Sequence, residues 1–100
     1  MIMNIIEVDL HIKSLLDNRL GLDNATMLEY QLDVFQKALN KYKIHKGLRI
    51  VFIHGEGTGK LKSKIVSVLK KSYKQYNFID ASTINSFKYR ISTAIVVTIK

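Results

Sequence analysis

The sequence contains no cysteine, no proline and no tryptophan, and the first of these absences excludes several kinds of chemistry. Without cysteine there is no disulfide framework, no thiolate nucleophile and no zinc site built from thiolates. The longest apolar runs are four residues, Ile50–Ile53 and Ala94–Val97, far below the roughly 20 that a membrane-spanning helix needs. Residues 1–7 also lack the basic and apolar segments of a secretion signal. We therefore predict a cytoplasmic domain that does not enter a membrane.

Acidic residues are scarce, and most of them lie in the first third of the chain. The 100 residues include 16 Lys and Arg against 8 Asp and Glu, a formal net charge of +8. Residues 34–100 hold 14 of the bases, with only Glu56 and Asp80 as acids. A field of this sign attracts polyanions, and nucleic acid is the commonest polyanion in a cell. The alternatives are a solvated lysine-rich surface and a docking face for an acidic protein.

Length and hydrophobic patterning predict one domain over residues 1–100, with a modest core. Alternation of apolar and polar residues indicates a first strand over 5–11, and a continuous β-branched run indicates a buried strand over 49–54. Two further strands are expected over 77–81 and 93–99.

Two amphipathic helices are expected between these strands. The first begins near residue 27, is capped by Asn24 or Thr26, and ends by Gly47; the second begins at about Lys60. Residues 13–24 are expected to form a turn-rich connection. The order β-α-β-α-β-β predicts an α/β fold, specifically an α+β two-layer sandwich. In it, both helices cover one face of a mixed four-stranded sheet.

Candidate catalytic residues lie where the first two strands end. Asp9 and His11 stand at the end of the first expected strand, and His54 stands at the end of the second. If these strands are neighbours, both histidines emerge at the same sheet edge and can act as general base and acid on a phosphodiester, with Asp9 orienting an imidazole. The same residues with Glu56 are also adequate ligands for a divalent ion. The simplest alternative is that they are polar residues satisfied by turns.

A glycine-rich turn follows the second strand with the spacing G-x-G-x-G, which is neither a dinucleotide fingerprint nor a P-loop. A turn of this kind before a helix exposes amides that can hold one phosphate, and a backbone phosphate of DNA or RNA suits it better than ATP. The alternative is a tight turn that needs glycine only for conformational freedom. The candidate phosphate ligands are Gly55, Gly57, Gly59, Lys60, Lys62 and Lys64.

The two motifs together resemble those of the Smr (small MutS-related) domain. Residues 8–12 read VDLHI, where the family has an L-D-L-H-G strand end, and residues 53–59 read IHGEGTG, where the family has a G-x-G-x turn. The resemblance covers nearly the whole chain and is especially close to a branch that forms the C-terminal part of longer proteins. It therefore implies that this chain is a piece of a larger protein with an N-terminal partner domain.

The resemblance implies a nucleic-acid-binding domain, with endonuclease activity on DNA or RNA as in some family members. Asp9, His11 and the glycine turn are the positions that it implicates. The third family motif, G-x-G-[VA]-T before the last strand, is not preserved, because Ile91 and Thr93 stand in the glycine positions. That change removes backbone able to approach a phosphate closely, which bears on cleavage more than on binding.

The expected function is therefore nucleic-acid binding with endonucleolytic cleavage. The alternatives are a non-catalytic nucleic-acid-binding module and a protein-interaction module of a larger protein. The residues indicate no obligatory cofactor and no built-in metal site; a dependence of cleavage on Mg²⁺ or Mn²⁺ is left open.

Overall fold

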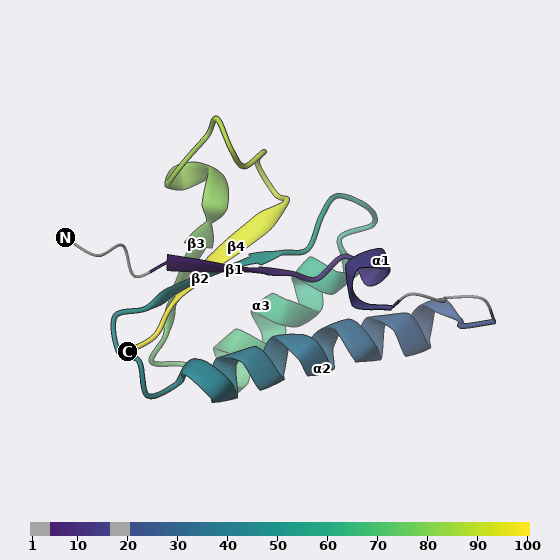
Figure 1. Ribbon diagram of the computed structural model, residues 1–100, viewed down its shortest axis with the longest axis horizontal. Helices are drawn as coiled ribbons and strands as arrows, with labels where there is room; N and C mark the ends of the chain where they lie inside the picture. Colours follow the sequence, from purple (N-terminus) through teal and green to yellow (C-terminus); the bar gives the residue numbers. More distant parts are fainter. Residues whose placement is uncertain (1–4, 17–20) are drawn as a thin grey trace.

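Four strands form one mixed sheet in the computed structural model, which describes residues 5–16 and 21–100 (Figure 1). The strands are β1 (Ile5–Asp9), β2 (Arg49–Ile53), β3 (Asn77–Asp80) and β4 (Ala94–Thr98). Their order in the sheet is β1-β2-β4-β3. β1 pairs in parallel with β2, whereas β4 runs antiparallel to both of its neighbours. The predicted four-stranded mixed sheet is confirmed.

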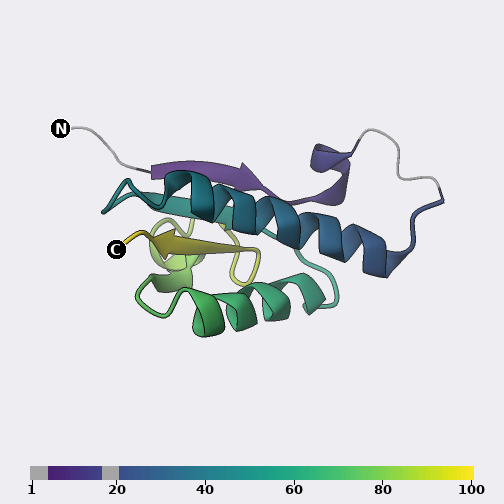
Figure 2. The same cartoon turned by 90° about the horizontal axis from the view of Figure 1, so that it is seen from below.

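Two long helices, α2 (Asn24–Tyr42) and α3 (Lys60–Ser72), pack side by side on one face of the sheet (Figures 1 and 2). The fold has two further short elements: α1 (Ile12–Leu15), which precedes α2, and the 3-10 helix η1 (Ala81–Thr83), which follows β3. α1 overlaps the segment 13–24 that was predicted as a turn-rich connection, so the prediction is wrong for residues 13–15. Residues 17–20 of that segment lie outside the described residues. Within the described ranges, no helix combines the length and apolar character needed to cross a bilayer.

The main core lies between the two long helices and the sheet. Phe35 of α2 meets Phe52 of β2 edge to face, with ring centroids 4.6 Å apart. Ile65 and Leu69 of α3 are also buried there, as the helical spacing of the sequence predicts. Because alternate residues of a strand point to opposite faces, these contacts use one face of the sheet alone.

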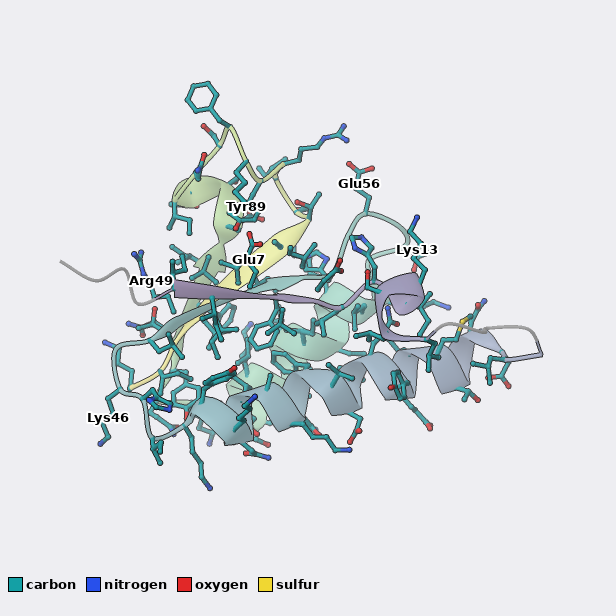
Figure 3. All side chains as sticks on the ribbon, in the orientation of Figure 1. Glu7, Lys13, Lys46, Arg49, Glu56 and Tyr89 are labelled. Carbon is teal, nitrogen blue, oxygen red and sulfur yellow. The ribbon has the colours of Figure 1, made fainter. Side chains whose placement is uncertain are left out.

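The opposite face of the sheet is covered by η1 and the chain that follows it, which lie above the sheet in Figure 1. Val51 of β2 and Val96 of β4 are buried there against Ala81 and Tyr89. The Tyr89 hydroxyl donates a hydrogen bond to Glu7 of β1, and Figure 3 shows the two side chains together. β2 is therefore buried on both faces, which explains its continuous apolar run.

The ends of α2 differ from the prediction. Its N-cap is Asp23, whose carboxylate accepts a hydrogen bond from the Thr26 amide at 2.7 Å. Asn24 and Thr26, the predicted caps, already lie inside the first turn. The helix ends at Tyr42 rather than running on to Gly47, because the chain turns there and the Gly47 amide donates to the Ile99 carbonyl at 2.8 Å.

Candidate functional site

The parallel pairing of β1 with β2 brings the two candidate motifs to one edge of the sheet. Asp9 is in register with Ile53, and the Leu10 amide donates to the Ile53 carbonyl at 2.8 Å. The next residues of each strand, His11 and His54, therefore leave the sheet at the same edge. This juxtaposition was predicted on the condition that the strands are neighbours, and they are.

Asp9 and His11 form a carboxylate–imidazole pair. His11 Nδ1 lies 2.8 Å from Asp9 Oδ1, and the same oxygen accepts the His11 amide at 2.9 Å. The other carboxylate oxygen accepts the Ser14 hydroxyl of α1 at 2.9 Å. Because an ionised carboxylate only accepts hydrogen bonds, Nδ1 of His11 carries a proton and donates it to Asp9. The sequence analysis missed Ser14, since it joins the pair only through α1.

Hydrogen bonds keep Asp9 ionised. Partial burial by itself would raise the pKa of Asp9, but hydrogen bonds from the His11 amide, the Ser14 hydroxyl and the His11 ring outweigh it. The net effect lowers the pKa of the Asp9 carboxyl below its ordinary value of 3.8. A negative charge is therefore held beside the His11 ring at neutral pH. This is the arrangement that orients an imidazole for accepting a proton.

The His11 ring lies directly against Gly55. A Cβ atom at Gly55 would stand only 2.3 Å from His11 Nε2, and the backbone there has φ of +77°. Gly55 therefore admits no side chain, because of both its left-handed conformation and the ring that rests on it. The motif after β1 and the motif after β2 thus form one site.

His54 is a second histidine of different character. It is 7% exposed, its Nδ1 lies 2.8 Å from the Gly55 carbonyl, and its Nε2 is buried without a partner among the described residues. Burial lowers the pKa of His54 below 6.5, and its hydrogen bond to the Gly55 carbonyl opposes this only in part. The ring is therefore neutral at pH 7, with the proton on Nδ1 and a lone pair on Nε2.

The loop of residues 55–59 between β2 and α3, hereafter the glycine loop, exposes backbone donors. The Gly55 amide is already engaged, since it donates to the Thr93 carbonyl at 2.9 Å. In the part of the chain that the structure describes, the amides of residues 56–59 donate to no protein acceptor. Gly57 and Gly59 adopt φ of +123° and +84°. Of the predicted phosphate donors, Gly57 and Gly59 are thus available and Gly55 supports the loop.

The three predicted lysines have different surroundings. Lys60 and Lys62 line a hollow that lies between the glycine loop and the N-terminal half of α2. Lys64 is exposed on α3, one turn further on. Lys62 Nζ lies 2.9 Å from Ser92 Oγ, and its positive charge contributes to lowering the pKa of His54. Lys60 and Lys64 are therefore the outward-facing cations, and Lys62 is an inner one.

Residues 90–93 brace the glycine loop from the other side. The Thr93 carbonyl accepts the His54 amide at 3.0 Å, and Arg90 pairs with Glu56 at 3.3 Å. Ser92 has φ of +60°, and its amide donates to Asp80 at 2.8 Å. The left-handed residue of this segment is thus Ser92, between the two positions, 91 and 93, where glycine was expected. No sequence signal marks it, because serine rarely adopts this conformation.

The residues considered for a divalent ion are not gathered into a metal cluster. Figure 3 shows Glu56 projecting from the outer tip of the glycine loop, where it pairs with Arg90. Across residues 5–16 and 21–100, no three His, Asp or Glu side chains converge as ligands. Asp9 and His11 are instead paired with each other.

No family model, curated protein or solved structure matches this chain. The geometry of the site therefore carries the functional argument, and the resemblance to the Smr domain stays a prediction.

Replacing Gly55 with alanine is expected to disturb the site more than replacing Gly59. The two glycines have similar φ, +77° and +84°, but a Cβ at Gly59 meets no atom within 4 Å. Both variants carry the same backbone strain, so the difference isolates the collision with the His11 ring. We expect Gly55→Ala to shift the His11 ring proton resonances and to lower the urea midpoint further than Gly59→Ala. Equal effects of the two variants on both readouts would refute the contact.

The buried neutral state of His54 predicts a pH dependence of stability. The folded chain disfavours protonation of His54, so below the ordinary histidine pKa of 6.5 the unfolded chain binds more protons. This contribution to stability is complete above pH 6.5 and is lost as the pH falls below it. We expect the free energy of unfolding of His54→Gln to fall less than that of the parent between about pH 7.5 and 5.5. His45→Gln, at an exposed histidine, is the matched control, and identical slopes for His54→Gln and the parent would contradict the assignment.

Proposed function

We propose that this chain is an Smr-type domain that binds the backbone of DNA or RNA at the glycine loop and cleaves it as an endonuclease. One observation carries the proposal: the Asp9-oriented ring of His11 rests on Gly55, beside loop amides that have no protein acceptor. The proposed general base thus lies against Gly55, the first residue of the loop whose amides are the proposed phosphate donors. The excess of lysine over acid in α3 adds the attraction that a polyanion requires.

The proposed binding step places one phosphate at the amides of the glycine loop. The N-terminus of α3 carries a partial positive charge and begins directly after Gly59. Lys60 lines the same hollow, and Lys64 continues along the exposed face of the helix. These groups bind phosphate without reading base identity, so we expect strong dependence on salt and little on sequence.

The proposed cleavage step is hydrolysis with His11 as general base. Nε2 of His11 accepts a proton from water while the water oxygen forms a bond to phosphorus and the ester P–O bond breaks. The departing oxygen takes a proton from solvent, and Asp9 stabilises the imidazolium that results. His54 takes no part in this proton transfer, because its ring is buried and its protonation is disfavoured.

The resemblance to the Smr domain supports the proposal at the same residues, Asp9, His11 and the glycine loop. The proposal extends to a cytoplasmic location, which the composition favours, and to an N-terminal partner domain, which the resemblance implies. Mg²⁺ or Mn²⁺ would enter with the substrate phosphate, so the assays below include both ions and a chelator.

A non-catalytic binding module is the second candidate, and a specific observation favours it. His54 is buried with Nδ1 held by the Gly55 carbonyl, so only one of the two histidines offers an accessible ring for proton transfer. In that case the glycine loop and the lysines bind nucleic acid, and the Asp9–His11 pair only fixes the loop.

His11→Ala separates the two candidates. If His11 is the general base, the variant loses cleavage by about 10²- to 10⁴-fold while its affinity changes little, because phosphate binding uses the loop amides and lysines. Cleavage is followed on denaturing gels and affinity by fluorescence anisotropy, with single-stranded, duplex and branched DNA and RNA. His45→Ala serves as the control. Undiminished cleavage by His11→Ala would refute the catalytic role, and binding without cleavage by the parent would favour the non-catalytic module.

Charge reversal on α3 tests the binding surface itself. The double variant Lys60→Glu/Lys64→Glu is expected to abolish binding at moderate salt, since it places acids at the proposed phosphate contacts. Lys70→Glu/Lys71→Glu makes the same change in charge at the far end of α3 and is expected to bind far better. For the parent, four phosphate contacts give a log–log slope of affinity against salt of about −3 to −4. Equal losses in the two double variants, or a slope near zero, would contradict a local phosphate site.

A further inference from the structure

A hollow of 310 Å³ lies between the N-terminal half of α2 and the glycine loop. Its apolar wall consists of Ile12 from α1, Met27 and Leu28 from α2, and Leu61 from α3. Met27 and Leu28 are half-buried and, within the described part of the chain, are not among the side chains that pack against the core. Their apolar surface therefore faces the hollow rather than the interior.

The same hollow holds amide groups able to form hydrogen bonds. Gln31 of α2 donates through Nε2 to the Leu10 carbonyl at 2.8 Å, an interaction that fixes the side chain and leaves its Oε1 as an acceptor. Asn24, in the first turn of α2, adds a second side-chain amide to the lining. Groups of this kind pair with the donor and acceptor edge of a planar base.

His54 is among the residues that line the hollow. It is 7% exposed, it lines the hollow, and its Nε2 has no partner in the residues described. A buried polar atom without a partner costs free energy that a hydrogen-bonding ligand recovers. Nδ1 carries the proton, so Nε2 can act only as an acceptor. The first turn of α3 and Lys60 complete the lining with groups that favour phosphate.

We infer that this hollow holds one nucleotide, with its base between the apolar wall and the amides and its phosphate at the start of α3. Ligand sites range upward from about 300 Å³, so a hollow of 310 Å³ is large enough for one nucleotide. A base in a duplex is stacked and paired, and it cannot enter such a site unless it leaves the helix. The inference rests on the proposed function and deepens it, because it makes single-stranded or unpaired nucleic acid the preferred substrate.

The first test compares a single-stranded 12-mer with an abasic 12-mer, which carries the same phosphates and no bases. We expect the intact strand to bind about 5- to 100-fold more tightly, the range that contacts to one base supply. A duplex of the same sequence is expected to bind more weakly than the single strand. Equal affinity of the abasic and intact strands would overturn the inference while leaving the proposed phosphate binding in place.

A pair of variants localises the effect. Met27→Ala/Leu28→Ala removes two side chains of the apolar wall, and it is expected to reduce binding of the intact strand toward that of the abasic strand. Tyr30→Ala is the matched control, because Tyr30 lies on the same helix, is 39% exposed and is outside the lining. Urea denaturation of both variants confirms that the comparison concerns folded protein. An unchanged preference for the intact strand in the double variant would overturn the inference.

A titration with free adenosine and uridine monophosphates, followed by backbone amide resonances, tests whether the hollow binds a free nucleotide or only a nucleotide within a strand. Shifts confined to the hollow, and lost in Met27→Ala/Leu28→Ala, support the inference whether or not a polynucleotide binds. If the monophosphates bind there and no strand does, the hollow is a nucleotide site and the proposed endonuclease is wrong. If neither monophosphates nor strands bind, both the inference and the proposed function fail.

Discussion

The candidate site depends on the parallel pairing of β1 with β2. That pairing sets the register in which the Leu10 amide meets the Ile53 carbonyl, so the residues after each strand leave the sheet together. The His11 ring can then rest on Gly55, which is the first residue of the glycine loop. A shift of one residue in register would turn the side chains of β1 to the opposite face of the sheet and separate the two motifs.

The two histidines of the site differ because of where the sheet leaves them. His11 stands beyond the sheet and takes its orientation from Asp9, which it contacts through both its amide and its ring. His54 follows β2 directly and stays buried, with its amide held by the Thr93 carbonyl and its ring by the Gly55 carbonyl. The same residue type thus provides an exposed ring in one position and a buried, uncharged ring in the other.

Patterning in the sequence predicted the sheet, both long helices and the meeting of the two motifs, because these features follow from local periodicity and short crossovers. It did not predict α1, although Ser14 of that helix completes the hydrogen bonding of Asp9. Nor did it predict that Ser92 takes the left-handed conformation or that Thr93 supports the loop. Those two roles arise from contacts with other segments of the chain, Ser92 with Asp80 and Lys62 and Thr93 with His54 and Gly55, and no local pattern records them. The cap of α2 is Asp23 and neither of the predicted residues, Asn24 or Thr26, since several neighbouring residues have side chains suited to that role.

The position of β4 has a consequence for the order in which the molecule folds. β4 is the last strand along the chain, yet it lies between β2 and β3, and in the sheet β3 pairs with β4 alone. During synthesis, β1, β2 and both long helices precede it, so the sheet stays incomplete until β4 inserts. Insertion also delivers Thr93 to the amides of His54 and Gly55. Closure of the core and completion of the loop therefore both depend on β4, through contacts between residues far apart in the chain, and contacts of this kind form more slowly than local ones.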